Sequence, residues 1–340
     1  MTTVSVIIPN YNREKLVVET IQNMLNQSLP PDEIIVIDDG STDNSVEVIR
    51  AFGSRVTLIQ QENQGPGAAR NAGLAIATGE YIQFMDSDDL ASANKLELQV
   101  AALEKNQADM VYSPWAKVYI ENGFVTFEDH ILQKQPLPEK LTILEWFLSG
   151  WSIVLQSCLF RRRFLSKIEP FRRDLLGWED SEYMVRLFAL KPKTIFAPGC
   201  LTLYRLHNYQ KLTESGTSDF RRLQDRVSTY PGFLQILNNY SPKVNLFVRV
   251  NMGLNAWQLW NAMQEQSKFS VLEMNKIKEI WESYPAILWY SYAIFKRIML
   301  RLRWHTTGSR WIYPYQSGFP SEVEYILIKN IGLGISQSWQ

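Results

Sequence analysis

The first part of the chain alternates between short apolar runs and amphipathic stretches. The apolar runs have the length and composition of strands covered on both faces, and they lie at residues 4–8, 34–37, 56–59 and 81–85. Apolar side chains recur at helical spacing over 16–25, and residues 67–77 form an alanine-rich helical stretch. This alternation predicts an α/β fold with a doubly wound sheet, because parallel strands are joined by right-handed crossovers.

Local signals predict where two of these elements begin or end. Pro9 cannot donate a hydrogen bond to a sheet ladder, so we expect the first strand to stop there. Ser41 and Asp43 precede an apolar stretch at 46–49, and their side chains can accept from helix N–H groups. We therefore expect Ser41 and Asp43 to cap the helix that follows the second strand.

Beyond residue 109 the pattern changes. Short segments with strand character lie at 110–113, 115–120, 124–127, 157–160 and 201–205. A helical stretch covers 179–190, and after about residue 215 the pattern is helical throughout. The first 114 residues contain no tryptophan, whereas seven of the eleven follow residue 250, so composition changes along with pattern. We therefore expect an α/β domain followed by a differently built helical region.

Composition excludes several classes of protein. Apolar residues make up 46% of the chain and charged residues 21%, which is typical of a globular fold. Lys plus Arg and Asp plus Glu both number 35, so nucleic acid is not an expected partner. The two cysteines, Cys158 and Cys200, form no disulfide framework or zinc motif, which favours a reducing, cytoplasmic location. The chain shows neither a signal-peptide pattern nor about 18 consecutive apolar residues, so no spanning helix is expected.

Polar and acidic residues follow three of the predicted strands. Pro9–Tyr11 comes after the first, Asp38 and Asp39 after the second, and Asp86–Asp89 after the fourth. Each segment alone is ordinary turn chemistry. In an open α/β sheet, however, ligands bind at the carboxyl ends of the strands. Three such clusters at one edge would repel one another without a cation or ligand between them.

Asp86 and Asp88 form the sharpest of these clusters. Two carboxylates two residues apart on a turn can bind a hard cation, and Mg²⁺ or Mn²⁺ completes its shell with water and phosphate oxygens. The chain contains no glycine-rich phosphate loop, and the Gly65–Gly67 segment is too short for a dinucleotide fingerprint. The pattern therefore predicts a diphosphate ligand held through Mn²⁺ or Mg²⁺.

Four ordered motifs resemble a known family. The segments VSVIIPNYNRE, IIVIDDGSTDNS, NQGPGAARNAGLAIATGEYIQFMDSDD and GWEDSEYMVRL together resemble a family 2 inverting glycosyltransferase. The resemblance covers about residues 3–210. It implies a GT-A, Rossmann-like fold with a doubly wound mixed sheet, followed here by a C-terminal helical extension. The implied catalytic domain covers 1–214, with a donor half at 1–113 and an acceptor half at 114–214, and the helical region covers 215–340.

The resemblance also implies a nucleotide-sugar donor, expected to be a UDP-sugar, and the residues that bind it. Pro9 and Tyr11 match the turn that packs against the base, with Tyr11 as the stacking ring. Asp39, and less directly Asp38, matches the carboxylate that accepts a hydrogen bond from the uracil imide. Arg70 matches a residue that contacts the base or the diphosphate.

The metal and the acceptor are assigned in the same way. Asp86 and Asp88 match the DxD motif, with Asp88 as the direct metal ligand and Asp86 facing the ribose. His207 resembles a histidine that completes the metal shell or touches the diphosphate, although a surface-loop histidine is the plain alternative. Asp180 matches the catalytic base of an ED motif, and a positioned carboxylate can take the acceptor's hydroxyl proton in one inverting displacement.

Two neighbours of Asp180 complete the predicted acceptor site. Trp178 is expected to floor the acceptor pocket, or to be a plain core tryptophan, and Glu179 lies beside it. Acidic residues at a helix start are also favourable with the helix dipole, which is the structural alternative for Glu179 and Asp180.

The C-terminal region differs from membrane-embedded synthases of this family. It lacks their QxxRW motif and spanning helices, so we expect transfer of a single sugar to a glycan or lipid-linked acceptor. Basic and aromatic residues are interleaved over 286–315. This segment suits peripheral contact with an anionic membrane on its inner face. Packing on the catalytic domain and homo-oligomer formation are equally consistent uses of it.

Two other functions are compatible with parts of the pattern. A non-catalytic nucleotide-sugar-binding protein would use Asp39 and the DxD motif but would have no use for Asp180. A nucleotidyltransferase shares the sheet and the metal chemistry, but it usually has a glycine-rich loop after the first strand, where PNYNRE has no glycine. The sugar, the acceptor and the linkage are not encoded in any motif of residues 114–175.

Overall fold

The main sheet has seven strands and is mixed. The computed structural model describes residues 2–128, 131, 133–134, 136–137, 139, 141–148, 153–207, 220–240, 246–266, 268–283 and 322–335. The strands run in the order β10-β6-β9-β4-β1-β2-β3. Parallel pairing joins β4, β1, β2 and β3, whereas β9 is antiparallel to both of its neighbours. Their bounds are β1 (Val4–Asn10), β2 (Glu33–Asp38), β3 (Thr57–Gln60), β4 (Tyr81–Phe84), β6 (Met110–Tyr112), β9 (Cys158–Arg161) and β10 (Thr194–Phe196).

The prediction that β1 stops at Pro9 is wrong. Pro9 pairs with Ile37, and the strand continues to Asn10. The backbone oxygen of Asn10 accepts from Asp39 on the β2 side, and that of Ile7 accepts from Met85 on the β4 side. Because successive residues of a parallel strand face opposite neighbours, the missing N–H of Pro9 points to the β4 side. β4 ends at Phe84, level with Ile7, so the ladder loses no hydrogen bond at Pro9.

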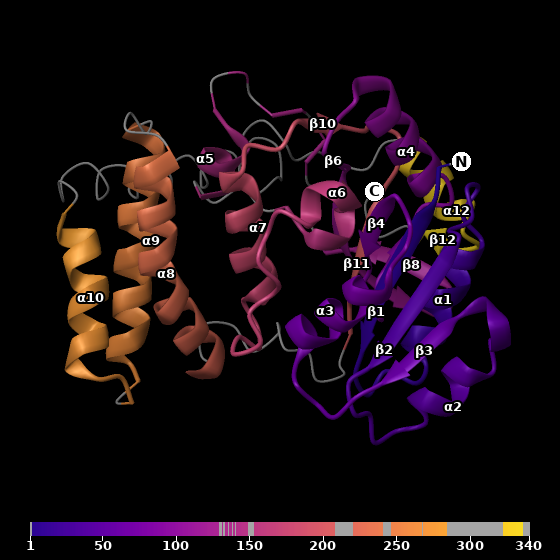
Figure 1. The fold of residues 1–340 in the computed structure, drawn as a ribbon, viewed down its shortest axis with the longest axis horizontal. Helices are drawn as coiled ribbons and strands as arrows, with labels where there is room; N and C mark the ends of the chain where they lie inside the picture. Colours follow the sequence, from indigo (N-terminus) through magenta and orange to yellow (C-terminus); the bar gives the residue numbers. More distant parts are fainter. Residues whose placement is uncertain are drawn as a thin grey trace.

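Helices cover both faces of this sheet (Figure 1). One face packs a core with α1, α2 and α4, and the other face packs with α3 and α7. A Cβ on Gly73 of α3 would lie 2.5 Å from a methyl group of Ile7, so glycine allows the close approach of α3 to the sheet. The bounds are α1 (Leu16–Leu25), α2 (Ser45–Arg50), α3 (Pro66–Ile76), α4 (Lys95–Asn106) and α7 (Glu179–Ala189), with shorter helices α5 (Ile143–Leu148) and α6 (Arg162–Leu165).

The predicted cap of α2 is only partly correct. Asp43 Oδ1 accepts from the N–H of Ser45, the first residue of the helix, at 3.0 Å. Ser41 does not cap α2, because its hydroxyl donates to Asp38 instead.

A second, five-stranded sheet has the order β12-β8-β7-β11-β5. Its strands are β5 (Leu90–Ala91), β7 (Trp115–Glu121), β8 (Phe124–Phe127), β11 (Thr202–Leu206) and β12 (Gly334–Ile335). The two-residue strand β5 directly follows Asp89, so the acidic turn after β4 leads from one sheet into the other. The prediction of helix alone after about residue 215 is wrong at β12, which pairs with β8.

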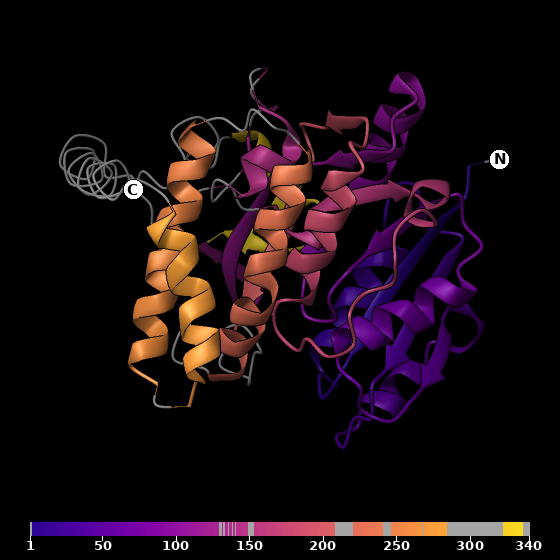
Figure 2. The same cartoon turned by 60° about the vertical axis from the view of Figure 1, so that its left-hand side comes forward.

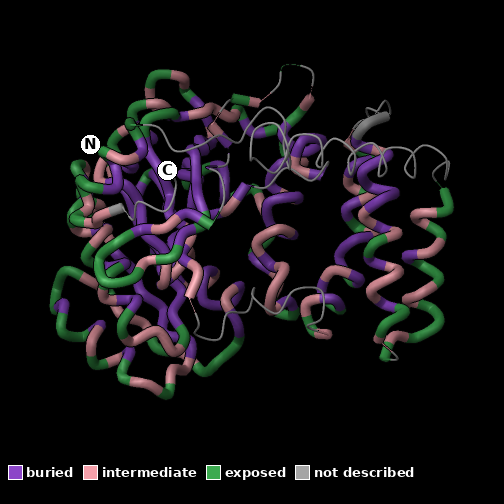
Figure 3. Tube along the Cα trace, turned by 180° about the vertical axis from the view of Figure 1, so that it is seen from behind, coloured by how far each residue is buried: buried purple, intermediate pink, exposed green. Residues whose placement is uncertain are grey.

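The remaining helices form the C-terminal extension. Figures 1 and 2 show α8, α9 and α10 side by side, beyond α7 as seen from the sheet. Figure 3 shows that α10, the outermost of them, is largely exposed, and Ile277 is its one buried residue. Within the described residues no helix is long and apolar enough to span a bilayer. The basic aromatic segment 286–315 lies outside the described residues. The bounds are α8 (Phe220–Tyr240), α9 (Leu246–Gln264), α10 (Val271–Glu282) and α12 (Glu322–Lys329).

Candidate active site

The loops after β1 and β2 are joined by Asp38. This buried carboxylate accepts from the side-chain amide of Asn10 at 2.9 Å and from the hydroxyl of Ser41 at 2.6 Å. Pro9 is buried within β1, whereas Tyr11 is 45% exposed at the edge of the sheet. Asp38 therefore holds two loops together, and Tyr11 presents a ring on which a base can stack.

Asp39 organises the loop that leads into α3. Its carboxylate accepts from the side chain of Gln61 at 2.7 Å and from the backbone N–H groups of Gln64 and Gly65 at 3.0 and 2.8 Å. Gly65 has a φ of +88°, a conformation that favours glycine. Asp39 is buried and already has three donors, so its predicted bond to a uracil imide stays a prediction.

Arg70 links the acidic turn after β4 to the start of α7. Its guanidinium donates to Asp86 Oδ1 at 2.8 Å and to Glu179 Oε1 at 2.6 Å. Arg70 and Glu179 are both buried, and each comes from the first half of its helix. The DxD turn and the ED motif, which are about 90 residues apart in the chain, thus share one cation.

The charges around Arg70 are unbalanced. Burial alone would lower the pKa of Arg70, but Asp86, Glu179 and Asp180 together raise it. Burial raises the pKa of Glu179 to about 7, with a further contribution from Asp180, although Arg70 opposes the shift. Burial and the neighbouring Asp88 likewise raise the pKa of Asp86 against the effect of Arg70. One guanidinium serves three carboxylates, so this edge of the sheet favours additional positive charge.

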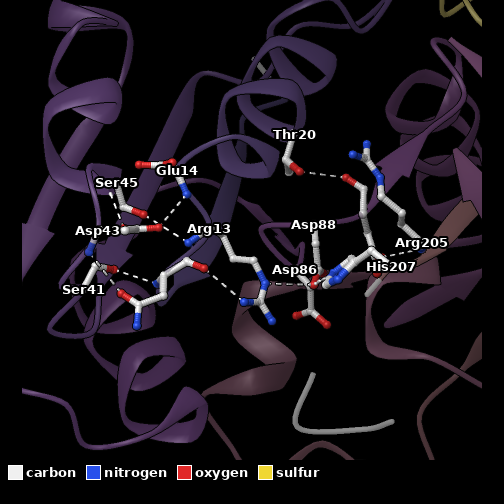
Figure 4. A network of polar contacts seen from close by, with 12 residues as sticks. Arg13, Glu14, Thr20, Ser41, Asp43, Ser45, Asp86, Asp88, Arg205 and His207 are labelled. Carbon is white, nitrogen blue, oxygen red and sulfur yellow. Dashed lines mark hydrogen bonds and ion pairs between the residues drawn. The ribbon is translucent and has the colours of Figure 1, made fainter. Parts of the chain in front are cut away.

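Asp88 and His207 meet at the same edge (Figure 4). Asp88 Oδ2 lies 2.9 Å from His207 Nε2 and 3.4 Å from Arg13 Nε. Asp88 belongs to the turn after β4, and His207 directly follows β11. The two residues predicted from separate motifs to bind a metal are therefore in contact.

Asp88 and His207 can supply part, but not all, of the coordination shell of a hard divalent cation. Among the described residues, no group of three or more His, Cys, Asp or Glu side chains forms a protein-only metal cage. Mg²⁺ and Mn²⁺ commonly use one or two carboxylates together with water and substrate phosphates, which matches Asp88, and His207 offers a ring nitrogen next to it. Asp86 is less accessible as a ligand, because Arg70 and Gln156 each donate to one of its two oxygens.

Gln156 is a site residue that the sequence patterns did not indicate. It lies in the short 3₁₀ turn η2 (Leu155–Ser157), before β9, and is buried. Its side-chain nitrogen donates to Asp86 Oδ2 and, at 2.9 Å, to Asp89 Oδ2. Asp89 is buried too, and its other oxygen accepts from the backbone N–H of Arg205. A single glutamine in a segment without a motif has no local signal that could have identified it.

The start of α7 presents the predicted base. Asp180 lies in the first helical turn, is half-buried, and accepts from the N–H of Ser181. Trp178 immediately precedes the helix, and the guanidinium of Arg226 lies 5.1 Å from its ring centre. Asp225 of α8 accepts from the backbone N–H groups of Leu176 and Gly177 at 2.8 and 3.0 Å. The C-terminal helices therefore hold the loop that carries Trp178, Glu179 and Asp180.

Solved structures define the class of fold. TarS residues 1–349 from S. aureus, in complex with UDP-GlcNAc, matches with a TM-score of 0.52 and 18% identity, covering 86% of this chain and 92% of that chain. Mannosyltransferase PcManGT from Pyrobaculum calidifontis, in complex with GDP-Man and Mn²⁺, matches with a TM-score of 0.53 and 21% identity, covering 81% and 78%. The chain has the GT-A fold of nucleotide-sugar-dependent glycosyltransferases, with a helical C-terminal part, as predicted.

Sequence relatives identify the family. The family model described as Glycosyl transferase family 2 matches residues 5–169. Glycosyltransferase GlyG of Streptococcus pneumoniae is 32% identical over 212 residues, which is 59% of this chain and 70% of that protein. The Escherichia coli UDP-Glc:alpha-D-GlcNAc-diphosphoundecaprenol beta-1,3-glucosyltransferase WfgD is 33% identical over 199 residues, covering 58% and 73%. The chain belongs to glycosyltransferase family 2.

Proposed function

We propose that this glycosyltransferase moves one sugar, with inversion, from a nucleotide-diphosphate sugar to a hydroxyl of a glycan or lipid-linked acceptor. The observation that carries the proposal is the link through Arg70, which places the predicted base helix against the acidic turn of the donor site. A UDP-sugar donor is supported by the nucleotide named for WfgD and by the UDP-GlcNAc complex of TarS. A lipid-linked acceptor is supported by the diphosphoundecaprenol acceptor named for WfgD.

The donor is bound at the carboxyl edge of the main sheet. Tyr11 stacks on the base, and Asp39 orders the loop beside it. A bound Mn²⁺ or Mg²⁺, held by Asp88 and His207, would neutralise charge that develops on the leaving diphosphate. Arg70 is paired with Asp86 and Glu179, so it holds the acidic turn of the donor site against the helix that carries Asp180.

Asp180 acts as the general base. It takes the proton of the acceptor hydroxyl while that oxygen forms a bond to the anomeric carbon, and the bond from that carbon to the diphosphate breaks. The helix start holds Asp180 through the N–H of Ser181, and Trp178 offers an apolar surface for the acceptor sugar. Glu179 is buried and forms an ion pair with Arg70. Any contact between Glu179 and the acceptor would be made in addition to this ion pair.

Location and assembly belong to the proposal as well. We infer a cytoplasmic enzyme that meets a lipid-linked acceptor at the inner face of the membrane. Segment 286–315 is the region assigned to that contact or to a homo-oligomer, on the basis of its basic and aromatic sequence.

The donor class can be measured directly. The experiment is a calorimetric titration with UDP, GDP, dTDP and CDP, each with Mn²⁺ and with a chelator. We expect UDP alone to bind with Mn²⁺, and we expect it to lose most of its affinity when a chelator removes the metal. Metal-independent binding of all four nucleotides, or no binding of any, would contradict the assigned donor site.

The base can be tested separately from the donor site. Asp180→Asn preserves shape but removes the proton acceptor, so we expect sugar transfer to fall by at least about 10³-fold. Mn²⁺-dependent nucleotide binding should stay within about twofold of the wild type, because Asp180 does not touch the donor ligands. Equal loss of binding and transfer would remove Asp180 from the base role. A fully active Asp180→Asn variant would show that another group accepts the proton of the acceptor hydroxyl.

A further inference from the structure

Gln156 lies between two carboxylates of the donor site. Its side-chain NH₂ group donates one hydrogen bond to Asp86 and one to Asp89, and no more than 4% of the residue is exposed. Asp86 is the first residue of the DxD motif, and Asp89 directly follows its last. Gln156 comes from the other half of the domain, 70 and 67 residues away in sequence.

The position of Gln156 is itself fixed from behind. Its backbone oxygen accepts from the side chain of Gln83 on β4 at 3.0 Å. The side-chain oxygen of Gln83 in turn accepts from Lys95 Nζ. These three side chains form a buried polar chain from α4 to the acidic turn, so Gln156 can move little without breaking several hydrogen bonds.

The chemistry of an amide suits this place. Asp86 is partly buried and Asp89 is fully buried, so the two carboxylates would repel each other, and a shared donor relieves that repulsion. Arg70 already contacts Asp86 and Arg13 already contacts Asp88, so a further arginine or lysine at this position would add to the positive charge that competes with a divalent cation for Asp88. A neutral amide holds both carboxylates while leaving the charge of the turn available to the donor complex.

We propose that Gln156 is a positioning residue of the donor site. It fixes the orientation of the Asp86–Asp89 turn, and through that turn it presents Asp88 toward the cation and the diphosphate. This inference rests on the proposed function, because it assigns Gln156 to the assembly of the same metal-dependent nucleotide site.

The decisive variant is Gln156→Met, which has similar length and no donor. We expect at least tenfold weaker binding of UDP with Mn²⁺ in calorimetric titrations, since a lost hydrogen bond to a buried carboxylate costs that much. Binding of Mn²⁺ alone, followed by the electron paramagnetic resonance signal of the free ion, should weaken in parallel.

Gln99 of α4 offers a matched control. It is another fully buried glutamine, and its side-chain nitrogen donates to Ser113 Oγ at 3.1 Å and to the backbone oxygen of Ser157 at 2.8 Å, not to a carboxylate. Gln99→Met should lose stability to a similar extent in thermal unfolding but keep Mn²⁺-dependent UDP affinity within about twofold. If Gln156→Met does not fold, Gln156→Ser, which leaves room for water, provides the same comparison.

The outcomes separate this inference from the proposed function. A wild type without Mn²⁺-dependent nucleotide binding would overturn both. A wild type that binds, together with a Gln156→Met variant that binds equally well, would overturn only the positioning role.

Discussion

At the scale of single residues, Lys95 is the most unusual side chain outside the candidate active site. The side chain is 1% exposed, and its ammonium group donates to the side-chain oxygen of Gln83. Burial lowers the pKa of Lys95 to about 8, although the neighbouring Cys200 and Cys158 oppose the shift. The buried charge of Lys95 costs stability at neutral pH, but its ammonium group supports the polar chain that leads to Gln156.

The buried lysine predicts a specific dependence of stability on pH. The pKa of Lys95 is lowered on folding, so between about pH 8 and the unfolded value near 10.5 the unfolded chain binds more protons. The free energy of unfolding should therefore rise over this window, by up to about 3 kcal/mol relative to a chain without the lysine. Urea unfolding of wild type and Lys95→Met from pH 7 to 10 measures the difference. If the difference in unfolding free energy between the two proteins did not change over this pH range, the pKa of Lys95 would not be lowered by burial.

At the scale of elements, α8 connects the helical extension to the loop before α7. Asp225 accepts from the two N–H groups of the loop before α7, and Arg226 lies over Trp178. Gly177 permits this packing, because a Cβ there would lie 2.9 Å from Arg222 Cγ. The orientation of the ED motif thus depends on a helix that follows it by more than 40 residues.

The contact from α8 gives a prediction for turnover. Asp225→Ala leaves two backbone donors without their acceptor, at a cost of roughly 1–3 kcal/mol in stability. We expect kcat to fall about tenfold or more, with UDP affinity nearly unchanged, because the donor site has its own support. Asp225→Asn keeps an acceptor oxygen and should lie between wild type and Asp225→Ala. Loss of UDP affinity without loss of kcat would show that α8 serves the donor side instead.

At the scale of the whole molecule, the last described segment joins the first half of the chain. Strand β12 pairs with β8, and Leu327 and Ile328 of α12 pack in one core with Leu90, which follows the acidic turn. Residues more than 230 positions apart thereby share the second sheet's core. The α12–β12 segment is an integral layer of the second sheet, whereas α8, α9 and α10 pack with the core of the main sheet.

A pair of isoleucines in α12 tests this arrangement. Ile328 is 1% exposed and Ile326 is 51% exposed in the same helix. Ile328→Ala should destabilise the protein by about 2–4 kcal/mol through a cavity, while Ile326→Ala should cost less than about 1 kcal/mol. Chemical denaturation compares the two variants. Similar small effects for both would mean that α12 does not pack as described.

Much of the parallel part of the fold was predictable, for a local reason. The runs at 34–37 and 81–85 lie within one or two residues of β2 and β4, since a buried strand carries its signal in its own residues. Turn chemistry likewise indicated the acidic residues after those strands. Pro9 shows the limit of such signals: whether its missing N–H matters depends on where β4 ends beside it.

The α/β pattern, the family motifs and the candidate chemistry of Asp86, Asp88 and Asp180 can be read from the amino-acid sequence. Their local signals act over a few residues, which is the range of helix spacing, strand runs and turns. The fold was needed to show that Arg70 bonds Glu179 across 109 residues and that Gln156 bonds Asp86 across 70. Such contacts depend on how sheets and helices stack, and a buried polar group finds its partner only when that packing is complete.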